Sequence, residues 1–379
     1  MGRPRPDTTD QHSPTAPPSD GPHGPSPTTH HPEPAASRSA ALQPGAGEVR
    51  AGGRARSKAG RRAPAWLRAG LSALLTAAIV APLAGAAHPA IPAPPPARLA
   101  PLTPSTLHTA YEANRADAAE AARMAAADGD GHRAAADRAL AAPSRNLLAF
   151  DGRGTGLATE VLGDLARADR VAVLVPGSDT SVDTYGRFHR AAAALYGDLG
   201  RRAPAGTRVA VVAWLGYRTP GTVSTTVTTT TRADRAAPRL RALVRELHAL
   251  TPARARISLL CHSYGSVVCG RTAPGLPVDD IVLVGSPGTG ADSVAGLHTP
   301  ARIWAARGSD DWVAHVPHVR ADLLGITVGF GTDPVSHAFG ARVFDAADAD
   351  HSGYFTPGSV SLANLARITL GETSEVTRA

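Results

Sequence analysis

The sequence is poor in aromatic residues, cysteine and lysine. Aromatic side chains make up 4% of its 379 residues, so a core would be built mostly from alanine, valine and leucine. There are two cysteines and no CxxC or spaced His–Cys pattern, which argues against a zinc site and a catalytic cysteine. No metal or organic cofactor is predicted.

Because Lys58 is the single lysine, the formal net charge of +7 comes from arginine. Much of the excess lies in one cluster before residue 70, made up of Arg50, Arg54, Arg56, Lys58, Arg61, Arg62 and Arg68. Such a charge can bind nucleic acid or an anionic membrane. Since no recognised nucleic-acid-binding motif accompanies it, nucleic acid is not a predicted partner.

The first 104 residues are predicted to precede the folded part. Residues 1–62 are rich in Pro, Gly, Ser and Thr with almost no bulky apolar side chains, which is typical of a disordered tail. Residues 63–87 end in an uncharged stretch long enough, as a helix, to cross a bilayer. Residues 88–104 are a Pro-rich linker.

Residues 63–87 have two membrane interpretations. Ala84-Gly85-Ala86 is typical of a signal-peptidase site, whereas the long preceding tail suits an uncleaved transmembrane anchor. An internal start codon would turn the tail into an ordinary signal peptide. In each case the basic residues that precede the apolar stretch are expected to stay on the cytoplasmic side. The part of the chain after the stretch is then exported, either secreted or tethered to the cell membrane. A buried Ala-rich core helix is the alternative, and Pro82 argues against it.

Two parts of different character follow the linker. Residues 105–144 are alanine-rich with interspersed charges and a break at Gly129-Asp130-Gly131, which predicts a helical hairpin. In residues 145–379, apolar β-branched runs alternate with helical patterns. The apolar runs, which are typical of buried parallel strands, are 171–175, 209–213, 257–260 and 281–284. The helical patterns are 185–199 and 239–250. This alternation predicts a doubly wound, mostly parallel α/β sheet. The Thr-rich tract 222–231 is either a lid near the site or an exposed β-hairpin.

The segment from Ile257 to Val268 places Ser263 between a buried strand and a helix, with Gly265 two residues on. This is the layout of a nucleophile elbow, G-x-S-x-G, in which small residues let strand and helix cross closely. Cys261 stands where the pattern has its first glycine, and it is small enough to be tolerated.

A serine nucleophile needs a base, and the base needs an orienting acid. Asp311 follows the strand-like run 301–307 and is favoured over Asp310 because its Asp-x-Val spacing is typical of an acid loop. His351 follows the strand-like run 341–344, where a base loop belongs. Three other histidines are weaker candidates, since two lie too near the acid and one precedes that strand: His315, His318 and His337.

The tetrahedral intermediate of acyl transfer also needs an oxyanion hole. The backbone N–H of Tyr264, directly after the nucleophile, is one predicted donor. The second is predicted in the loop after the run 171–175, with Ser178 favoured. An ordinary turn at Pro176-Gly177 is the alternative.

Five segments together resemble an uncharacterised α/β-hydrolase family of actinobacteria, α/β-hydrolase family 8. They are Val173-Leu174-Val175-Pro176-Gly177, Ala213-Trp214-Leu215-Gly216-Tyr217, His262-Ser263-Tyr264-Gly265-Ser266, Val284-Gly285-Ser286-Pro287-Gly288 and His351-Ser352-Gly353-Tyr354-Phe355. The resemblance covers about residues 105–372. It implies an α/β-hydrolase fold and the same three catalytic residues, but no substrate.

The two cysteines flank the elbow. Cys261 ends the predicted strand, and Cys269 lies one helical turn beyond Gly265, so the side chains could form a disulfide. Two small buried hydrophobic residues are the alternative.

These features predict a serine hydrolase that cleaves an ester, rather than an amide, through an acyl-enzyme on Ser263. The expected partner is a small-molecule ester or a lipid. Two alternatives remain: a tethered lipase, and a surface or binding protein that keeps the fold without activity.

Overall fold

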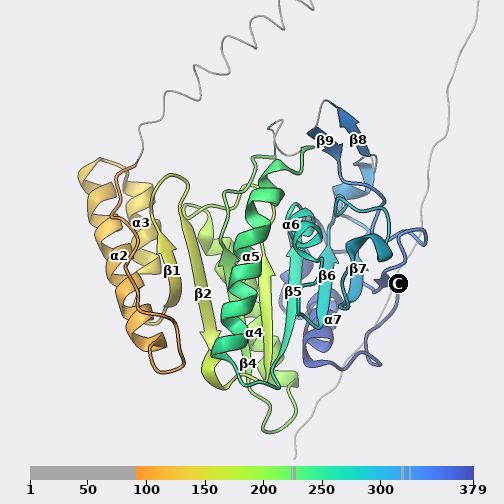
Figure 1. Cartoon of the computed structure of the whole chain (residues 1–379), viewed down its shortest axis with the longest axis horizontal. Helices are drawn as coiled ribbons and strands as arrows, with labels where there is room; N and C mark the ends of the chain where they lie inside the picture. Colours follow the sequence, from red (N-terminus) through yellow and green to blue (C-terminus); the bar gives the residue numbers. More distant parts are fainter. Residues whose placement is uncertain (1–90, 223, 225–227, 317–319, 324–325) are drawn as a thin grey trace, which may run out of the picture. The chain divides into compact units, whose positions relative to one another are not determined.

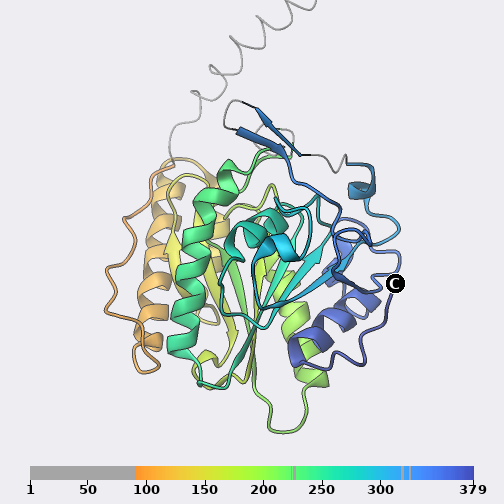
Figure 2. The same cartoon turned by 45° about the vertical axis from the view of Figure 1, so that its right-hand side comes forward.

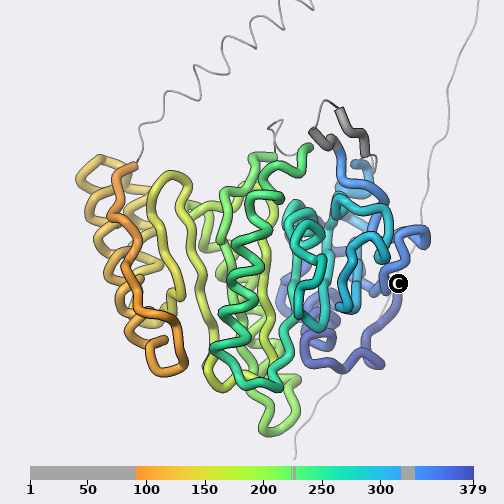
Figure 3. The backbone as a smooth tube through the Cα atoms, in the orientation of Figure 1, coloured from red at the N-terminus to blue at the C-terminus, as the bar shows by residue number. Residues whose placement is uncertain are grey.

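The computed structural model describes residues 91–222, 224, 228–316, 320–323 and 326–379 (Figure 1; the backbone is traced in Figure 3). The predicted tail 1–62 and membrane segment 63–87 lie outside these residues. Within the described part of the chain, no helix is both long and apolar enough to cross a membrane. The linker runs without helix or strand from residue 91 to residue 103.

The predicted helical hairpin is confirmed. Helix α2 spans Leu107–Ala127 and α3 spans Gly131–Leu140; the two helices pack against each other, and α2 also packs against the first strand. Asn114 of α2 is buried and donates through Nδ2 to the main-chain oxygens of Leu147 and Leu148, at 3.0 Å each. The hairpin is thereby fixed to one edge of the sheet.

The predicted doubly wound sheet is also confirmed. Eight strands lie in the order β1-β2-β4-β3-β5-β6-β7-β10. Their bounds are β1 Asn146–Asp151, β2 Leu157–Gly163, β3 Arg170–Val175, β4 Val209–Leu215, β5 Arg256–His262, β6 Asp280–Val284, β7 Arg302–Ala306 and β10 Arg342–Val343. The pairs β1–β2 and β2–β4 are antiparallel and the others are parallel. The central strands are buried on both faces, which explains their continuous apolar runs.

Helices cover both faces of the sheet. In Figure 1, α5 (Thr231–Leu250) and α6 (Gly265–Thr272) lie in front, while α4 (Tyr185–Arg202) and α7 (Val360–Leu370) lie behind. Short 3-10 helices occur at η1 Leu165–Arg167, η3 Ala295–Leu297, η4 Trp312–His315 and η5 Gly353–Phe355. Two hydrophobic clusters form the core, one on each side.

Helix α5 begins eight residues earlier than the pattern at 239–250 predicts. Its first turns bury Ala233, Ala236 and Ala237, and the Thr230 hydroxyl donates to the Asp234 carboxylate at 2.9 Å. Burial of these small residues and this local bond extend the helix through Pro238. Because proline lacks an N–H, it removes one helical hydrogen bond there.

The parallel strands end at one edge of the sheet, and the loops after β5, β7 and β10 all emerge there. A separate antiparallel hairpin, β8 (Arg320–Leu323) and β9 (Ile326–Gly329), lies at the same edge in both views (Figures 1 and 2). In open α/β sheets this edge is where ligands bind.

Candidate active site

Ser263 occupies a tight turn between β5 and α6. Its φ is +53°, in the left-handed region that non-glycine residues rarely adopt, and its side chain is buried. Gly265 makes this turn possible, because a Cβ there would lie 2.5 Å from the main-chain oxygen of Val175. Ser263 thus lies at a tight turn between a strand and a helix, the layout of a nucleophile elbow.

Three predicted residues meet above this turn. His351 Nε2 lies 2.9 Å from Ser263 Oγ, and His351 Nδ1 lies 2.9 Å from Asp311 Oδ1. Asp310 is exposed and contacts the hydroxyl of Ser309 instead. The geometry therefore selects Asp311 over Asp310 as the partner of His351.

The weaker histidine candidates do not join this group. His315 is exposed, and its ring nitrogen lies 3.3 Å from the Trp312 carbonyl oxygen. His337 is exposed as well, and His318 lies outside the described residues.

The Asp311 carboxylate is buried at 1% exposure among hydrogen-bond donors. Burial alone would raise its pKa, but donors from His351, the Tyr354 hydroxyl (2.5 Å) and the Val313 N–H (2.9 Å) outweigh burial and lower that pKa. The Tyr354 hydroxyl in turn accepts from Gly308 N–H at 3.1 Å. Burial and this carboxylate raise the pKa of Tyr354, so its proton stays in place.

The two predicted oxyanion donors, Tyr264 and Ser178, line the same cavity as Ser263. Neither backbone N–H donates to another of the described residues. Gly177 brings the Ser178 loop close, since a Cβ at Gly177 would lie 2.6 Å from the Ser263 Cβ. Within the described part of the chain, neither amide is therefore taken up by another residue.

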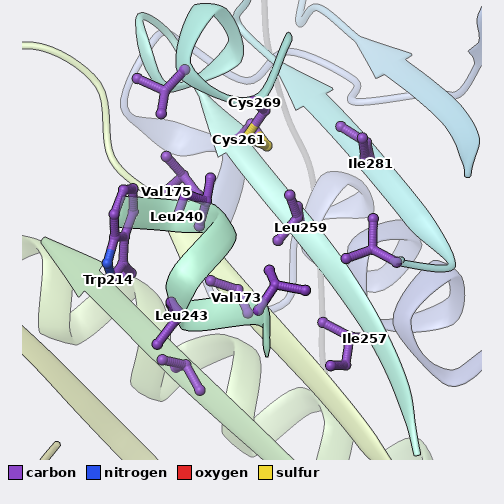
Figure 4. Packing of buried hydrophobic residues seen from close by; sticks show 14 of the residues in the cluster. Val173, Val175, Trp214, Leu240, Leu243, Ile257, Leu259, Cys261, Cys269 and Ile281 are labelled. Atoms are coloured by element: carbon purple, nitrogen blue, oxygen red, sulfur yellow. A yellow bond between two sulfur atoms is a disulfide. The ribbon is translucent and has the colours of Figure 1, made fainter. Parts of the chain in front are cut away.

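The two cysteines are joined by a disulfide, and both are fully buried. Figure 4 shows Cys261 of β5 and Cys269 of α6 beside Val175 and Leu240 in the core. The bridge therefore ties the strand before Ser263 to the helix after it.

Two further residues contact the acid and the base, and neither is singled out by its position in the sequence. His262 Nε2 donates to the His351 carbonyl oxygen at 2.6 Å, and burial lowers the pKa of His262 to about 4, so its ring is neutral at pH 7. Gly285 has a φ of +55°, and a Cβ there would lie 2.8 Å from Asp311 Oδ2. Their only signal in the sequence was membership in the segments that carry the family resemblance.

A cavity of about 950 Å³ opens beside Ser263. Trp312 lines it, is 49% exposed, and places its ring 4.5 Å from that of His351. Thr222 and Thr228 of the Thr-rich tract also line it, and the Tyr264 hydroxyl donates to the Thr229 carbonyl oxygen at 2.7 Å. The described part of this tract therefore lies at the site, as the lid interpretation expects.

Among the residues that the structure describes, no group of three or more His, Cys, Asp or Glu side chains is arranged to hold a metal ion.

Comparison with known proteins identifies related sequences. A family model described as alpha/beta hydrolase matches residues 151–321. An uncharacterized protein of Mycobacterium bovis is 33% identical over 198 residues, which cover 48% of this chain and 73% of that protein. An uncharacterized protein of Mycobacterium tuberculosis is 29% identical over 262 residues, covering 59% of this chain and 38% of that protein. The chain thus spans about two fifths of the length of this second relative.

Two solved structures are similar as well. One is an a/b serine hydrolase without lid from Xanthomonas campestris, 17% identical with a TM-score of 0.38, covering 61% of this chain and 95% of that chain. The other is an esterase from Mycobacterium marinum, 15% identical with a TM-score of 0.35, covering 68% and 90%. At these TM-scores the likenesses carry no argument about activity.

Proposed function

We propose that this chain, which belongs to the alpha/beta-hydrolase family, cleaves an ester through an acyl-enzyme formed on Ser263. The observation that carries the proposal is the position of His351, which lies 2.9 Å from both the Ser263 hydroxyl and the Asp311 carboxylate. An amide substrate is the less favoured alternative.

The geometry supports a two-step mechanism. His351 Nε2 accepts the proton of Ser263 Oγ as the oxygen attacks the ester carbonyl, and Asp311 stabilises the imidazolium that forms. The N–H groups of Tyr264 and Ser178 would hold the oxyanion. His351 then gives its proton to the departing alcohol. In the second step His351 activates water, which releases the acid and restores the serine.

Export of the catalytic part is also part of the proposal. The Cys261–Cys269 disulfide supports it, because such bridges persist in oxidising compartments. Secretion and tethering through residues 63–87 would separate in a cell fractionation, where a tethered protein stays with the membrane and a secreted one appears in the medium. Accumulation in the cytoplasm would contradict both.

A fluorophosphonate probe tests the nucleophile directly. Wild type should be labelled, Ser263→Ala should not, and Ser309→Ala, which removes an exposed hydroxyl outside the cavity, should label like wild type. Silence of a folded wild-type sample would instead favour the non-catalytic binding protein.

A chain-length series of p-nitrophenyl esters tests the lipase alternative. Apolar side chains line the cavity, including Trp312, Val316 and Phe330. A small-molecule esterase should prefer short acyl chains, whereas a rise in kcat/KM toward long chains would favour a lipase.

A further inference from the structure

We propose that Arg187 and Arg190 make the cavity selective for esters that carry an anionic group, a carboxylate or a phosphate, at a distance from the scissile bond. This inference rests on the proposed function and concerns the substrate class of the same site.

Both arginines come from the start of α4. They are three residues apart, so they lie on one face of the helix, and both line the cavity that Ser263 lines. Both side chains are exposed, and within the described part of the chain neither forms an ion pair or hydrogen bond with another residue. Their donors are therefore available to a ligand.

The remaining charges of the cavity do not offset these two cations. Asp179 is the one carboxylate among the described lining residues, and its oxygens already accept hydrogen bonds from Thr222 N–H at 3.1 and 3.2 Å and from the Thr222 hydroxyl. The wall formed by Arg187 and Arg190 is thus positive. The planar guanidinium fork of arginine matches carboxylate and phosphate oxygens in pairs.

Other residues that line the cavity are apolar and would contact the uncharged part of the substrate. Trp312, Val316 and Phe330 come from a different segment than α4 and supply apolar surface. A volume of about 950 Å³ is within the range of small-molecule sites. Together they fit a compact ester with an apolar body and one anionic end.

Matched pairs of substrates test the selectivity. On the acyl side, mono-p-nitrophenyl adipate is compared with its methyl ester, and on the alcohol side p-acetoxybenzoate is compared with its methyl ester. Wild type should prefer the charged member of at least one pair by roughly tenfold in kcat/KM, and the preference should shrink as salt is added. Inhibition by benzoate and by phenyl phosphate then tells which anion the site prefers.

The variants locate the effect. In the double variant Arg187→Gln, Arg190→Gln the preference for the charged ester should disappear, so that kcat/KM is about the same for both members of a pair. Arg245→Gln removes the same charge from an exposed position on α5 outside the cavity, and should keep the preference. Equal kcat/KM values for the charged and the neutral ester in wild type would overturn the proposed selectivity. So would a preference for the charged ester that persists in the double variant.

Failure of this inference can be told apart from failure of the esterase proposal. Suppose that the neutral esters are cleaved and the fluorophosphonate labels Ser263, but replacing both arginines leaves the preference between charged and neutral esters unchanged. Then only the proposed selectivity is wrong. If no ester is cleaved, calorimetry on Ser263→Ala decides. Monomethyl adipate should then bind more tightly than dimethyl adipate, and the difference should vanish when both arginines are replaced. Equal affinities would overturn the inference.

Discussion

The nucleophile and its base are held in place by different means. Ser263 is fixed by its own backbone, through the close contact at Gly265 and the disulfide one helical turn away. His351 and Asp311 are instead positioned by side-chain hydrogen bonds from Tyr354 and His262. The first half of the site depends on close backbone packing and a disulfide, whereas the second depends on side-chain hydrogen bonds. The two halves should therefore respond differently to substitution.

The largest effect should come from the hydrogen-bonded half. Asp311→Asn keeps the side-chain size but removes the charge that stabilises the His351 imidazolium, so kcat should fall by about 10³- to 10⁴-fold with little change in KM. Asp310→Asn is the matched control, because that carboxylate is exposed and does not contact His351. A comparable loss in Asp310→Asn would reverse the assignment of the acid.

Substitution in the backbone-held half should lower the stability of the folded protein. In Gly265→Ala the new methyl group would meet the Val175 oxygen at 2.5 Å, so the free energy of unfolding should fall by about 2–4 kcal/mol. Gly200→Ala in α4 meets no atom within 4 Å, and should stabilise the protein by about 0.5–1 kcal/mol. Urea denaturation measures both. Equal behaviour of the two variants would show that the elbow is not sterically constrained.

His262, in the hydrogen-bonded half, should make the stability of the protein depend on pH. Burial lowers its pKa in the folded protein from 6.5 to about 4, so the unfolded chain binds more protons between these values. The resulting stability is fully present above pH 6.5, and about 2–3 kcal/mol of it should be lost as pH falls toward 4. His262→Gln keeps a donor for the His351 carbonyl oxygen but does not titrate, so its unfolding free energy should vary less over this range. An unchanged slope would mean that other groups carry the pH dependence.

Removing the disulfide should have the smallest effect. The bridge closes a short loop, since its cysteines are 8 residues apart, so loop entropy contributes only about 2 kcal/mol. The pair Cys261→Ala and Cys269→Ala should lower the unfolding free energy by that amount. Dithiothreitol should shift the unfolding midpoint of wild type but not of this variant. A shift in both would point to an unspecific effect of the reductant.

The sequence predicts best what is encoded locally. The four apolar runs that became β3, β4, β5 and β6 are continuous because these strands are buried on both faces, and the elbow has a fixed spacing around Ser263. The choice between Asp310 and Asp311 could be ranked, because loop spacing carries some information.

The residues that support the predicted acid and base across long stretches of chain were not predictable. Tyr354 reaches Asp311 across 43 residues, and His262 reaches the His351 carbonyl oxygen across 89 residues. No periodicity or spacing in a single sequence encodes such a pairing. The same holds for Arg187 and Arg190, which look like ordinary exposed helix residues until the fold places them at the cavity.

The bond from Asn114 to β1 has a consequence for assembly. The outermost strand of a sheet can recruit a strand of another molecule and so begin aggregation. Here α2 takes up main-chain oxygens of β1 at one rim, while at the opposite rim β10 offers a strand of only two residues. Both edges of the eight-stranded sheet are thus poor templates for pairing with a strand of another molecule.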